Sequence, residues 1–303
     1  MKQNRRTCKS IVKKILQWGY RFMQEHWILF RALVWLEAMG VTEWLMVSFS
    51  DTERNVNHKA LELNRAFFVE RQDDVKRVLK LLEDEKSKKV FKACIDYRSY
   101  HTKIPSGLYS EKNQYFDEQL IVLKNQELFI DCGAFIGDTI QIFIMRAKKA
   151  RIKDYSIVAF EPSSRNAAII EKYFKKNAKV RLVKKGVSNC KKAVPFIQDG
   201  LKSKVDFNSE FEREHIEVVP LDSIEECQKA TYIKMDIEGQ ELSALEGAKT
   251  IIQKNKPKLA ICIYHSNEDM LDIPIYIKKL NPQYKLYVRH YSRGASETVL
   301  YAI

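Results

Sequence analysis

The sequence has neither paired cysteines nor a histidine-rich motif. It contains six isolated cysteines: Cys8, Cys94, Cys132, Cys190, Cys227 and Cys262. None belongs to a C-x-x-C pair, which argues against a disulfide framework and against a zinc site. Reduced thiols in a cytoplasmic protein are the simplest interpretation. We therefore expect a cytoplasmic protein without a metal centre.

Long uninterrupted apolar runs are lacking as well. The nearest candidate covers residues 27–50, but Arg31, Glu37 and Glu43 interrupt it, and no small-residue cleavage pattern follows. A membrane span needs about 20 predominantly apolar residues, and a signal peptide needs such a cleavage site. The segment is a poor candidate for either, and a buried pair of helices is the better interpretation.

Negative charge is scarce relative to positive charge. The chain has 52 lysines and arginines against 39 acidic residues, which gives a formal charge of +13. A lysine-rich, highly soluble surface is the plainer explanation. The more specific explanation is a positive electrostatic field that attracts nucleic acid, phospholipid or a phosphorylated glycan. Charge alone does not choose among these partners.

The chain divides near residues 101–118, where Pro105 and Gly107 indicate a connecting loop. Helical periodicity is found before this loop at residues 11–16, 22–36 and 61–82. We predict a helical N-terminal region over residues 1–110. A plain helical packing domain is the favoured interpretation, and a substrate cap, an oligomerisation element or a dock for an anionic lipid surface stay open. A second domain is expected over residues 111–303.

In the second domain, short apolar strands alternate with amphipathic helices. The strands are expected at residues 128–131, 157–160, 180–183, 217–220, 232–235, 258–264, 285–290 and 298–303. The helices are expected at residues 138–149, 164–176, 240–254 and 273–280. A polar stretch with short strands lies between residues 187 and 217. This order predicts an α/β fold with a doubly wound, mostly parallel sheet, ligands at the strands' carboxyl ends, and an antiparallel C-terminal hairpin at one edge.

The strongest local motif is a glycine turn between a strand and a helix. Gly133 and Gly137 let the backbone turn tightly and approach a ligand closely. Their spacing differs from the G-x-G-x-x-G that serves a dinucleotide pyrophosphate. Asp131 and Asp138 flank the turn, where they would repel a pyrophosphate but suit a cofactor with an ammonium and a sulfonium group. For this segment alone, a tight connection with helix-capping acids is the structural alternative.

Polar residues also follow three later strands. Glu161 ends the second strand, where a ribose-binding acid is expected in such folds. Asp236 and Glu238 alternate with apolar residues after Lys234, so the three share one side if the strand stays extended. His265 ends the next strand and is the leading candidate for a general base, since its unperturbed pKa is about 6.5. The alternatives are a solvated loop acid at Glu161 and an internal lysine–carboxylate pair at Lys234.

Taken together, these motifs resemble the FkbM-type methyltransferase family. The matching segments, in order, are YFD at 115–117, FIDCGAFIGDT at 129–139, AFEP at 159–162, VPLD at 219–222, IKMDIEGQEL at 233–242, LEGA at 245–248, KPKLAICIYH at 256–265, YVRHY at 287–291 and ETVLYA at 297–302. They spread over roughly residues 115–303, so the N-terminal region is not covered. The family commonly has asparagine where this chain has Phe135, and we expect this to be a helix-start position that tolerates the change.

The resemblance implies a class I, Rossmann-like methyltransferase fold over residues 111–303, with S-adenosylmethionine as cofactor. The residues it implies for the methionine end of the cofactor are Asp131, Gly133, Ala134, Gly137, Asp138 and Thr139. Glu161 with Pro162 would bind the ribose, and Gly186 with Val187 would form a lip for the adenine. Asp236, Glu238 and His265 would face the methyl acceptor.

The implied reaction is methylation of a hydroxyl oxygen on a sugar, a glycan or a secondary metabolite. His265, assisted by Asp236, would remove the hydroxyl proton as the oxygen attacks. A metal-assisted variant with Asp236 and Glu238 as oxygen ligands stays open. The expected partner is a small-molecule or glycan acceptor, anionic and lipid-linked forms included, while contact with a membrane surface and homo-oligomerisation stay open.

Two other functions keep the same fold. An RNA methyltransferase would use the basic surface, but the sequence has no Asn-Pro-Pro-Tyr type motif for a flipped base and no appended RNA-binding module. Nucleic acid is therefore the less favoured partner. A catalytically inactive scaffold is the third hypothesis, and the intact acids and glycines of the expected cofactor cleft argue against it.

Overall fold

A computed structural model describes residues 57–199, 202–205 and 214–303. The helices expected at 11–16 and 22–36, and the apolar segment 27–50, lie outside the described residues. Among the described residues, none of the helices combines the length and the apolar character that crossing a membrane requires.

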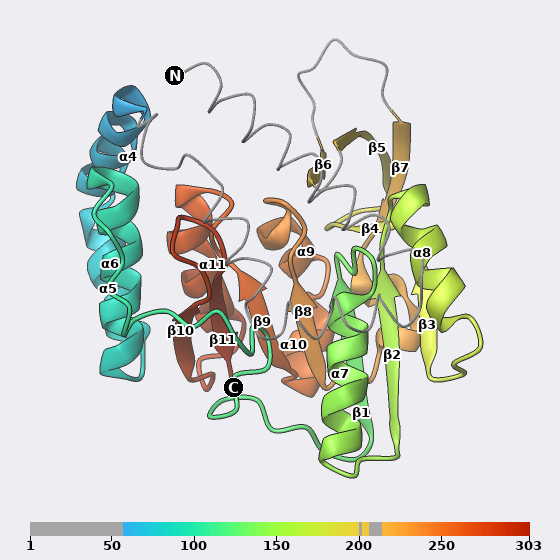
Figure 1. Cartoon of the computed structure of the whole chain (residues 1–303). Coiled ribbons are helices and arrows are strands. Elements are labelled where there is room, and N and C mark those ends of the chain that lie inside the picture. The colour runs from blue at the N-terminus through green and yellow to red at the C-terminus, as the bar shows by residue number, and fades with distance from the viewer. Residues whose placement is uncertain (1–56, 200–201, 206–213) are drawn as a thin grey trace, which may run out of the picture.

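The centre of the molecule is a seven-stranded sheet in the order β10-β11-β9-β8-β1-β2-β3 (Figure 1). Its strands are β1 (Glu127–Cys132), β2 (Tyr155–Phe160), β3 (Val180–Val183), β8 (Tyr232–Met235), β9 (Lys258–Cys262), β10 (Leu286–His290) and β11 (Thr298–Ala302). Only β11 runs against the other strands of this sheet. The predicted mostly parallel α/β sheet and its C-terminal antiparallel hairpin are confirmed.

The strand order indicates where a ligand is expected to bind. From β1 the chain winds outward through β2 and β3, and it then returns to the other side of β1 as β8 and β9. The order therefore reverses between β1 and β8, and ligands of doubly wound sheets bind beyond the carboxyl ends of the strands at such a point. The turns that follow β1 and β8 are the ones that carry the predicted polar residues.

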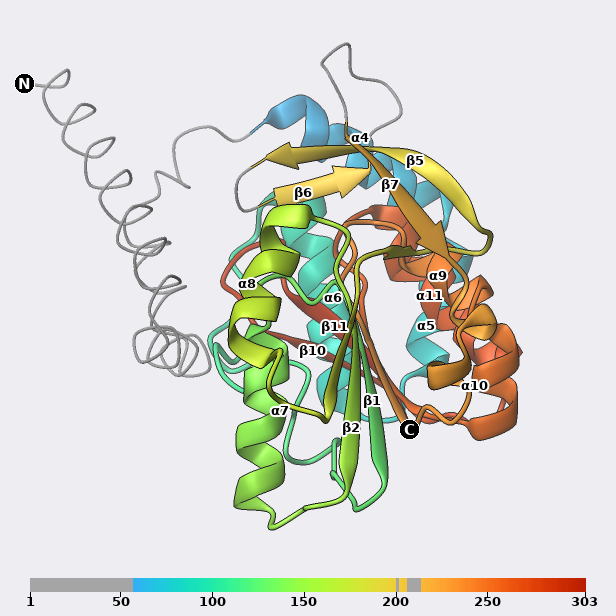
Figure 2. The same ribbon diagram turned by 90° about the vertical axis from the view of Figure 1, so that its right-hand side faces the viewer.

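Helices cover both faces of the large sheet, as Figure 2 shows. The helices α7 (Asp138–Lys149) and α8 (Ser164–Phe174) cover one face, and α9 (Glu241–Glu246), α10 (Lys249–Asn255) and α11 (Asn267–Leu280) cover the other. The single helix expected at 240–254 is two helices, interrupted at Gly247, where an added Cβ would lie 2.0 Å from the carbonyl oxygen of Ser188. Helix α11 begins earlier than expected because Ser266 and Asp269 form a capping box.

Aromatic side chains fill the core between β1, β8 and α7. The rings of Phe129 and Phe143 stack with centroids 4.9 Å apart. Phe116, from the long connection before β1, lies 6.0 Å from both Phe129 and Tyr232 by ring centroids. Phe116 is fully buried and therefore anchors this connection against the sheet. Its neighbour Tyr115 is held near the end of β8 as a result.

The described N-terminal helices lie along the β10 edge of the sheet (Figure 1). They are α4 (His58–Glu70), α5 (Gln72–Leu81) and α6 (Glu85–Tyr100), so the helix expected at 61–82 is interrupted at Arg71. The backbone N–H of Glu83 donates to Leu286 of β10 (3.0 Å), and that of Val288 donates to Ser87 Oγ (2.9 Å). The exposed groups of the edge strand are thus partly covered. The domain boundary at residue 110 stays a prediction.

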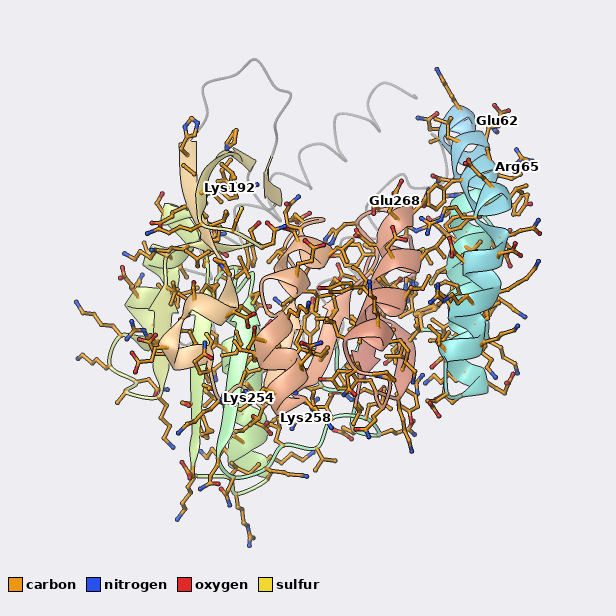
Figure 3. All side chains as sticks on the ribbon, turned by 180° about the vertical axis from the view of Figure 1, so that it is seen from behind. Glu62, Arg65, Lys192, Lys254, Lys258 and Glu268 are labelled. Atoms are coloured by element: carbon orange, nitrogen blue, oxygen red, sulfur yellow. The ribbon has the colours of Figure 1, made fainter. Side chains whose placement is uncertain are left out.

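A smaller sheet is formed by the polar stretch in which short strands were expected. Its order is β4 (Gly186–Val187), β7 (Glu214–Val219), β5 (Lys192–Asp199) and β6 (Lys202–Val205). In Figure 3, Lys258 at the start of β9 lies at the lower end of the molecule, while Lys192 and Glu268 lie at the upper end. The smaller sheet therefore lies at the end of the molecule toward which the parallel strands run.

Candidate active site

Two turns meet closely at the point where the strand order reverses. Gly133, directly after β1, has a φ of +79°, and an added Cβ there would lie 1.9 Å from the carbonyl oxygen of Asp236, which follows β8. Gly137, at the start of α7, has a φ of +87°, and its Cβ would lie 2.6 Å from Phe174 Cε2. The glycine at 133 is therefore required both by the backbone conformation and by the neighbouring strand end.

Phe135 lies inside the glycine turn and does not start the helix, which begins at Asp138. The expectation of a helix-start position is therefore wrong. Its φ is +48°, in the left-handed region that asparagine adopts much more readily than phenylalanine. This conformation explains why asparagine suits the position. The backbone N–H of Phe135 donates to Glu161 Oε2 (2.8 Å), which ties the turn to the end of β2.

Glu161 is the buried acid at the end of β2. Its carboxylate is 5% exposed, and Oε1 accepts the N–H of Ser163 (2.9 Å) beyond Pro162. No ion pair to Glu161 is found among the described residues. Burial raises the pKa of Glu161 to about 7, against the backbone hydrogen bonds that favour the carboxylate. A buried acid at this position, with no cationic side chain paired to it among the described residues, suits a ligand that has hydroxyl donors and positive charge.

Asp131 and Lys234 form a buried ion pair beneath the glycine turn. The Nζ of Lys234 lies 3.1 Å from Asp131 Oδ1 and donates to the carbonyl oxygen of Gly133 (2.8 Å). Burial raises the pKa of Asp131, although Lys234 opposes the shift. Burial also disfavours the Lys234 ammonium, but Asp131 and Asp236 outweigh it and raise the pKa of that group. Lys234 thus makes the internal pair that sequence reasoning weighed as its alternative.

The other predicted polar residues after β8 come together with His265. Strand β8 ends at Met235, and Glu238 has a φ of +57°, so the chain turns after Asp236 instead of staying extended. His265 Nε2 lies 3.4 Å from Asp236 Oδ1 and 3.7 Å from Glu238 Oε2. The structure therefore brings Asp236, Glu238 and His265 together, while the ion pair of Lys234 is made with Asp131.

Glu241 is a member of this group that sequence reasoning missed. Its side chain is fully buried, and Oε1 lies 3.1 Å from His265 Nδ1. The same carboxylate accepts the backbone N–H groups of Ile237 (2.7 Å) and Gly239 (3.0 Å). The carboxylate of Glu241 therefore binds the backbone of the turn that follows Asp236 and also lies beside Nδ1 of the His265 ring. Glu241 lies inside the matching segment at 233–242, five residues after Asp236, but nothing in the sequence indicated that its side chain reaches His265.

The surrounding carboxylates keep His265 charged. Burial disfavours the imidazolium, but Glu241, Asp236 and Glu238 outweigh burial and raise the pKa of His265 to about 9. The charge of Lys234, and then that of His265, lowers the pKa of Asp236 in spite of its burial. At neutral pH the cluster therefore holds an ionised aspartate beside an imidazolium. The ordinary histidine pKa assumed from the sequence does not apply here.

Tyrosines and a further acid surround Asp236. The hydroxyls of Tyr115 and Tyr264 donate to the two oxygens of Asp236, at 2.7 Å and 3.2 Å. Glu297, from the loop before β11, accepts a hydrogen bond from Gln114. Burial, and then the charge of Asp236, raises the pKa of Glu297 to about 7. The motifs at 115–117 and 297–302 contain Tyr115 and Glu297, but no local pattern indicated that either meets Asp236.

The remaining predicted cofactor residues lie around the same turn or in the smaller sheet. Ala134 and Thr139 are buried in the turn and in the first turn of α7. Asp138 begins α7 and is partly exposed, and burial raises its pKa to about 6. Gly186 and Val187 form β4, where Gly186 packs against Val218. Their predicted contact with the adenine stays a prediction.

Comparisons with known proteins agree with this geometry. A family model described as "Methyltransferase FkbM domain" matches residues 131–284, slightly more than half of the 303 residues. The crystal structure of methyltransferase FkbM from Methylobacillus flagellatus KT is 28% identical, with a TM-score of 0.64, over 79% of this chain and 60% of that chain. The chain belongs to the FkbM methyltransferase family. The expected resemblance is confirmed, and S-adenosylmethionine is the cofactor of this methyltransferase fold.

More distant solved structures also match. Fibrillarin of Aeropyrum pernix, crystallised with bound S-adenosyl-L-methionine, is 11% identical over 61% of this chain and 70% of that chain, with a TM-score of 0.36. A SAM-dependent methyltransferase from Aquifex aeolicus is 13% identical over 60% of this chain and 84% of that chain, with a TM-score of 0.35. No curated protein matches the chain. The chain spans 60% of the length of the Methylobacillus protein.

The residues at the glycine turn fit S-adenosylmethionine. Gly133 leaves no side chain between the turn and the end of β8, since a Cβ there would collide with the Asp236 peptide. Glu161 accepts the Phe135 N–H of the turn, Asp138 directly follows the turn, and the lysine beneath the turn, Lys234, is committed to Asp131. A ligand with two positive groups and two ribose hydroxyls matches such surroundings.

Proposed function

We propose that this FkbM-family protein methylates a hydroxyl oxygen of a sugar, a glycan or a secondary metabolite. The observation that carries the proposal is the group formed by Asp236, Glu238 and His265 beyond β8 and β9. It lies directly beside the glycine turn, because Gly133 abuts the Asp236 peptide. An acceptor held by this group would therefore be adjacent to a cofactor on the turn.

The roles of the chain's own residues follow from their positions. The glycine turn and Glu161 would hold the cofactor, with Glu161 accepting the ribose hydroxyls. When bound, S-adenosylmethionine supplies a methyl group that its sulfonium has already activated, and the proton that the acceptor hydroxyl loses would pass to the ionised carboxylate of Asp236. Asp236, oriented by the hydroxyls of Tyr115 and Tyr264, would orient the acceptor together with His265. Alignment is the main task of such a site, since near-attack geometry alone supplies several kcal/mol, about 7–11 kcal/mol in favourable cases.

Replacement of His265 tests the acceptor side. In an assay that follows labelled methyl transfer to a panel of sugar and polyol hydroxyls, we expect His265→Ala to lower kcat by about a hundredfold or more. The dissociation constant of S-adenosylmethionine should change by less than about threefold, because His265 lies on the acceptor side. His215→Ala is the matched control, since His215 lies in β7 of the smaller sheet. Unchanged turnover in His265→Ala would remove His265 from the reaction.

A further inference from the structure

The acceptor side of the site contains a set of atoms with the spacing of metal ligands. One oxygen of Asp236, one oxygen of Glu241 and one ring nitrogen of His265 all lie within 4.8 Å of one another. The side chain of His265 is 9% exposed, and that of Glu241 is fully buried. Three potential ligands therefore converge from two different strand ends and the first turn of a helix.

The contacts of His265 do not have hydrogen-bond geometry. Its two ring nitrogens lie 3.1 Å from Glu241 Oε1 and 3.4 Å from Asp236 Oδ1, yet neither nitrogen makes a hydrogen bond to any described residue. Ligand atoms that share an ion at about 2.0–2.2 Å are themselves about 3.0–3.5 Å apart, and their lone pairs point at the ion. Only one ring nitrogen can bind a given ion, so one of the two short, unaligned contacts is what such an arrangement produces. The other carboxylate would reach the same ion across the cluster, within the 4.8 Å that the three ligand atoms span.

The charge of the cluster also calls for a cation. Asp236, Glu238 and Glu241 surround a single imidazole, and the buried Glu297 lies nearby. Among the described residues the nearest lysine, Lys234, is already paired with Asp131. The imidazolium of His265 can compensate only one of these carboxylates, and a buried carboxylate without a compensating charge is costly. A divalent ion would neutralise two of them with the imidazole as a neutral ligand.

The neighbours of these residues would hold them in a ligating arrangement. Asp236 accepts the Tyr115 hydroxyl on its second oxygen, and Glu241 accepts two backbone N–H groups. Hydrogen bonds of this kind orient metal ligands in most metal sites. An ion would take one nitrogen of His265, and the other nitrogen would stay beside its own carboxylate neighbour, Glu241 at 3.1 Å or Asp236 at 3.4 Å.

We propose that Asp236, Glu241 and His265 form a binding site for a divalent transition-metal ion. Two carboxylate oxygens and one imidazole suit Mn²⁺, Fe²⁺ or Zn²⁺ better than Ca²⁺ or Mg²⁺, which prefer oxygen ligands alone. The proposal deepens the proposed function and rests on it for its role, since the ion would bind the acceptor hydroxyl beside the cofactor and lower its pKa. Glu241 takes the place that sequence reasoning gave to Glu238.

Binding of Mn²⁺ tests the site directly. The full-length protein is treated with a chelator, and free Mn²⁺ is followed by electron paramagnetic resonance during titration, with Zn²⁺ as a competitor. We expect one saturable site per chain that Zn²⁺ displaces. Asp236→Asn and His265→Gln should each raise the dissociation constant at least tenfold. Glu268→Gln, an exposed acid at the start of α11, is the control that should bind as the wild type does.

A second measurement does not depend on the variants. In the nuclear magnetic resonance spectrum of the wild type, substoichiometric Mn²⁺ should broaden the imidazole resonances of His265 before those of His58 or His101. The proposal is wrong if neither Mn²⁺ nor Zn²⁺ binds saturably, if both variants bind as the wild type does, or if His265 is not broadened. Titration of S-adenosylmethionine into the same protein distinguishes failure of the metal site from failure of the proposed methyl transfer. If the cofactor binds but no metal ion does, only the proposed metal site is wrong.

Discussion

At the scale of single residues, Gly133 shows how closely the two halves of the site meet. Its positive φ disfavours any side chain by about 1–2 kcal/mol, and a Cβ would lie 1.9 Å from the Asp236 carbonyl oxygen. We expect Gly133→Ala to lower the melting temperature and to weaken S-adenosylmethionine binding more than tenfold. Gly107→Ala is the control, because its Cβ would meet nothing within 4 Å. Equal behaviour of the two variants would contradict the close contact between the turns.

The ionisation of Glu161 gives the second prediction at this scale. Burial raises its pKa to about 7, and only the carboxylate accepts both ribose hydroxyls, so cofactor binding favours the ionised form. Affinity for S-adenosylmethionine should therefore rise as the pH increases through 7, by up to about tenfold per unit below it, and level off above. In Glu161→Gln this dependence should disappear. An unchanged pH profile in the variant would assign the dependence to another group.

At the scale of elements, helix α6 contacts the two loops that are proposed to bind the methyl acceptor, through Arg98. Arg98 donates to the carbonyl oxygen of Tyr264 and to Asn267 Oδ1 (3.1 Å), on either side of His265. It also reaches the carbonyl oxygen of Ala295 (3.5 Å), in the loop that carries Glu297. The N-terminal helices therefore contact both loops of the acceptor side, although the family match begins only at residue 131.

Loss of the Arg98 contacts should affect turnover more than cofactor binding. We expect Arg98→Met to lower kcat about ten- to a hundredfold, because a displacement of about 1 Å at His265 is sufficient for such a loss. The dissociation constant of S-adenosylmethionine should change less than about twofold. Arg65→Met is the matched control, since Arg65 is exposed on α4. If kcat of Arg98→Met equals that of Arg65→Met, α6 does not position the acceptor loops.

Elements with strong local signals were predictable from the sequence. The bounds of α7, β3 and β8 agree with the prediction, because apolar periodicity and flanking glycines or polar residues define them locally. The helix expected at 240–254 is divided in the structure because Gly247 packs against the Ser188 backbone, which lies 59 positions earlier in the chain. Helix α11 begins at Asn267, earlier than the predicted residue 273, because the Ser266 and Asp269 capping box starts it, and Pro274 lies inside the helix.

At the scale of the whole molecule, the sequence indicated which strand ends bring polar residues together in the candidate site, but not how their side chains pair. Asp236, Glu238 and His265 were found because charged residues at the carboxyl edge of a parallel sheet are unusual. The pairing of Lys234 with Asp131, and the approach of Glu241, Tyr115 and Glu297 to the group, depend on contacts between distant segments. Such contacts leave no periodic signal in the sequence.

The overall charge of the chain is opposite in sign to the charge of its site. The formal charge is +13, yet the carboxylates Asp236, Glu238, Glu241 and Glu297 gather around His265. The net charge of a protein affects its solubility and its long-range attraction of partners, whereas the chemistry of a site depends on the groups within hydrogen-bonding distance. The basic surface therefore does not contradict a cofactor with positive charge or a bound cation.

The most direct test of the central claim is calorimetric titration of S-adenosylmethionine into the purified wild type and a Glu161→Ala variant at pH 8. The proposed site predicts saturable binding of one cofactor per chain, weakened at least tenfold in the variant by loss of the carboxylate that accepts the ribose hydroxyls. Equal binding by the two proteins would contradict the placement of the ribose at Glu161. No binding to a folded wild type would contradict the proposed methyl transfer itself.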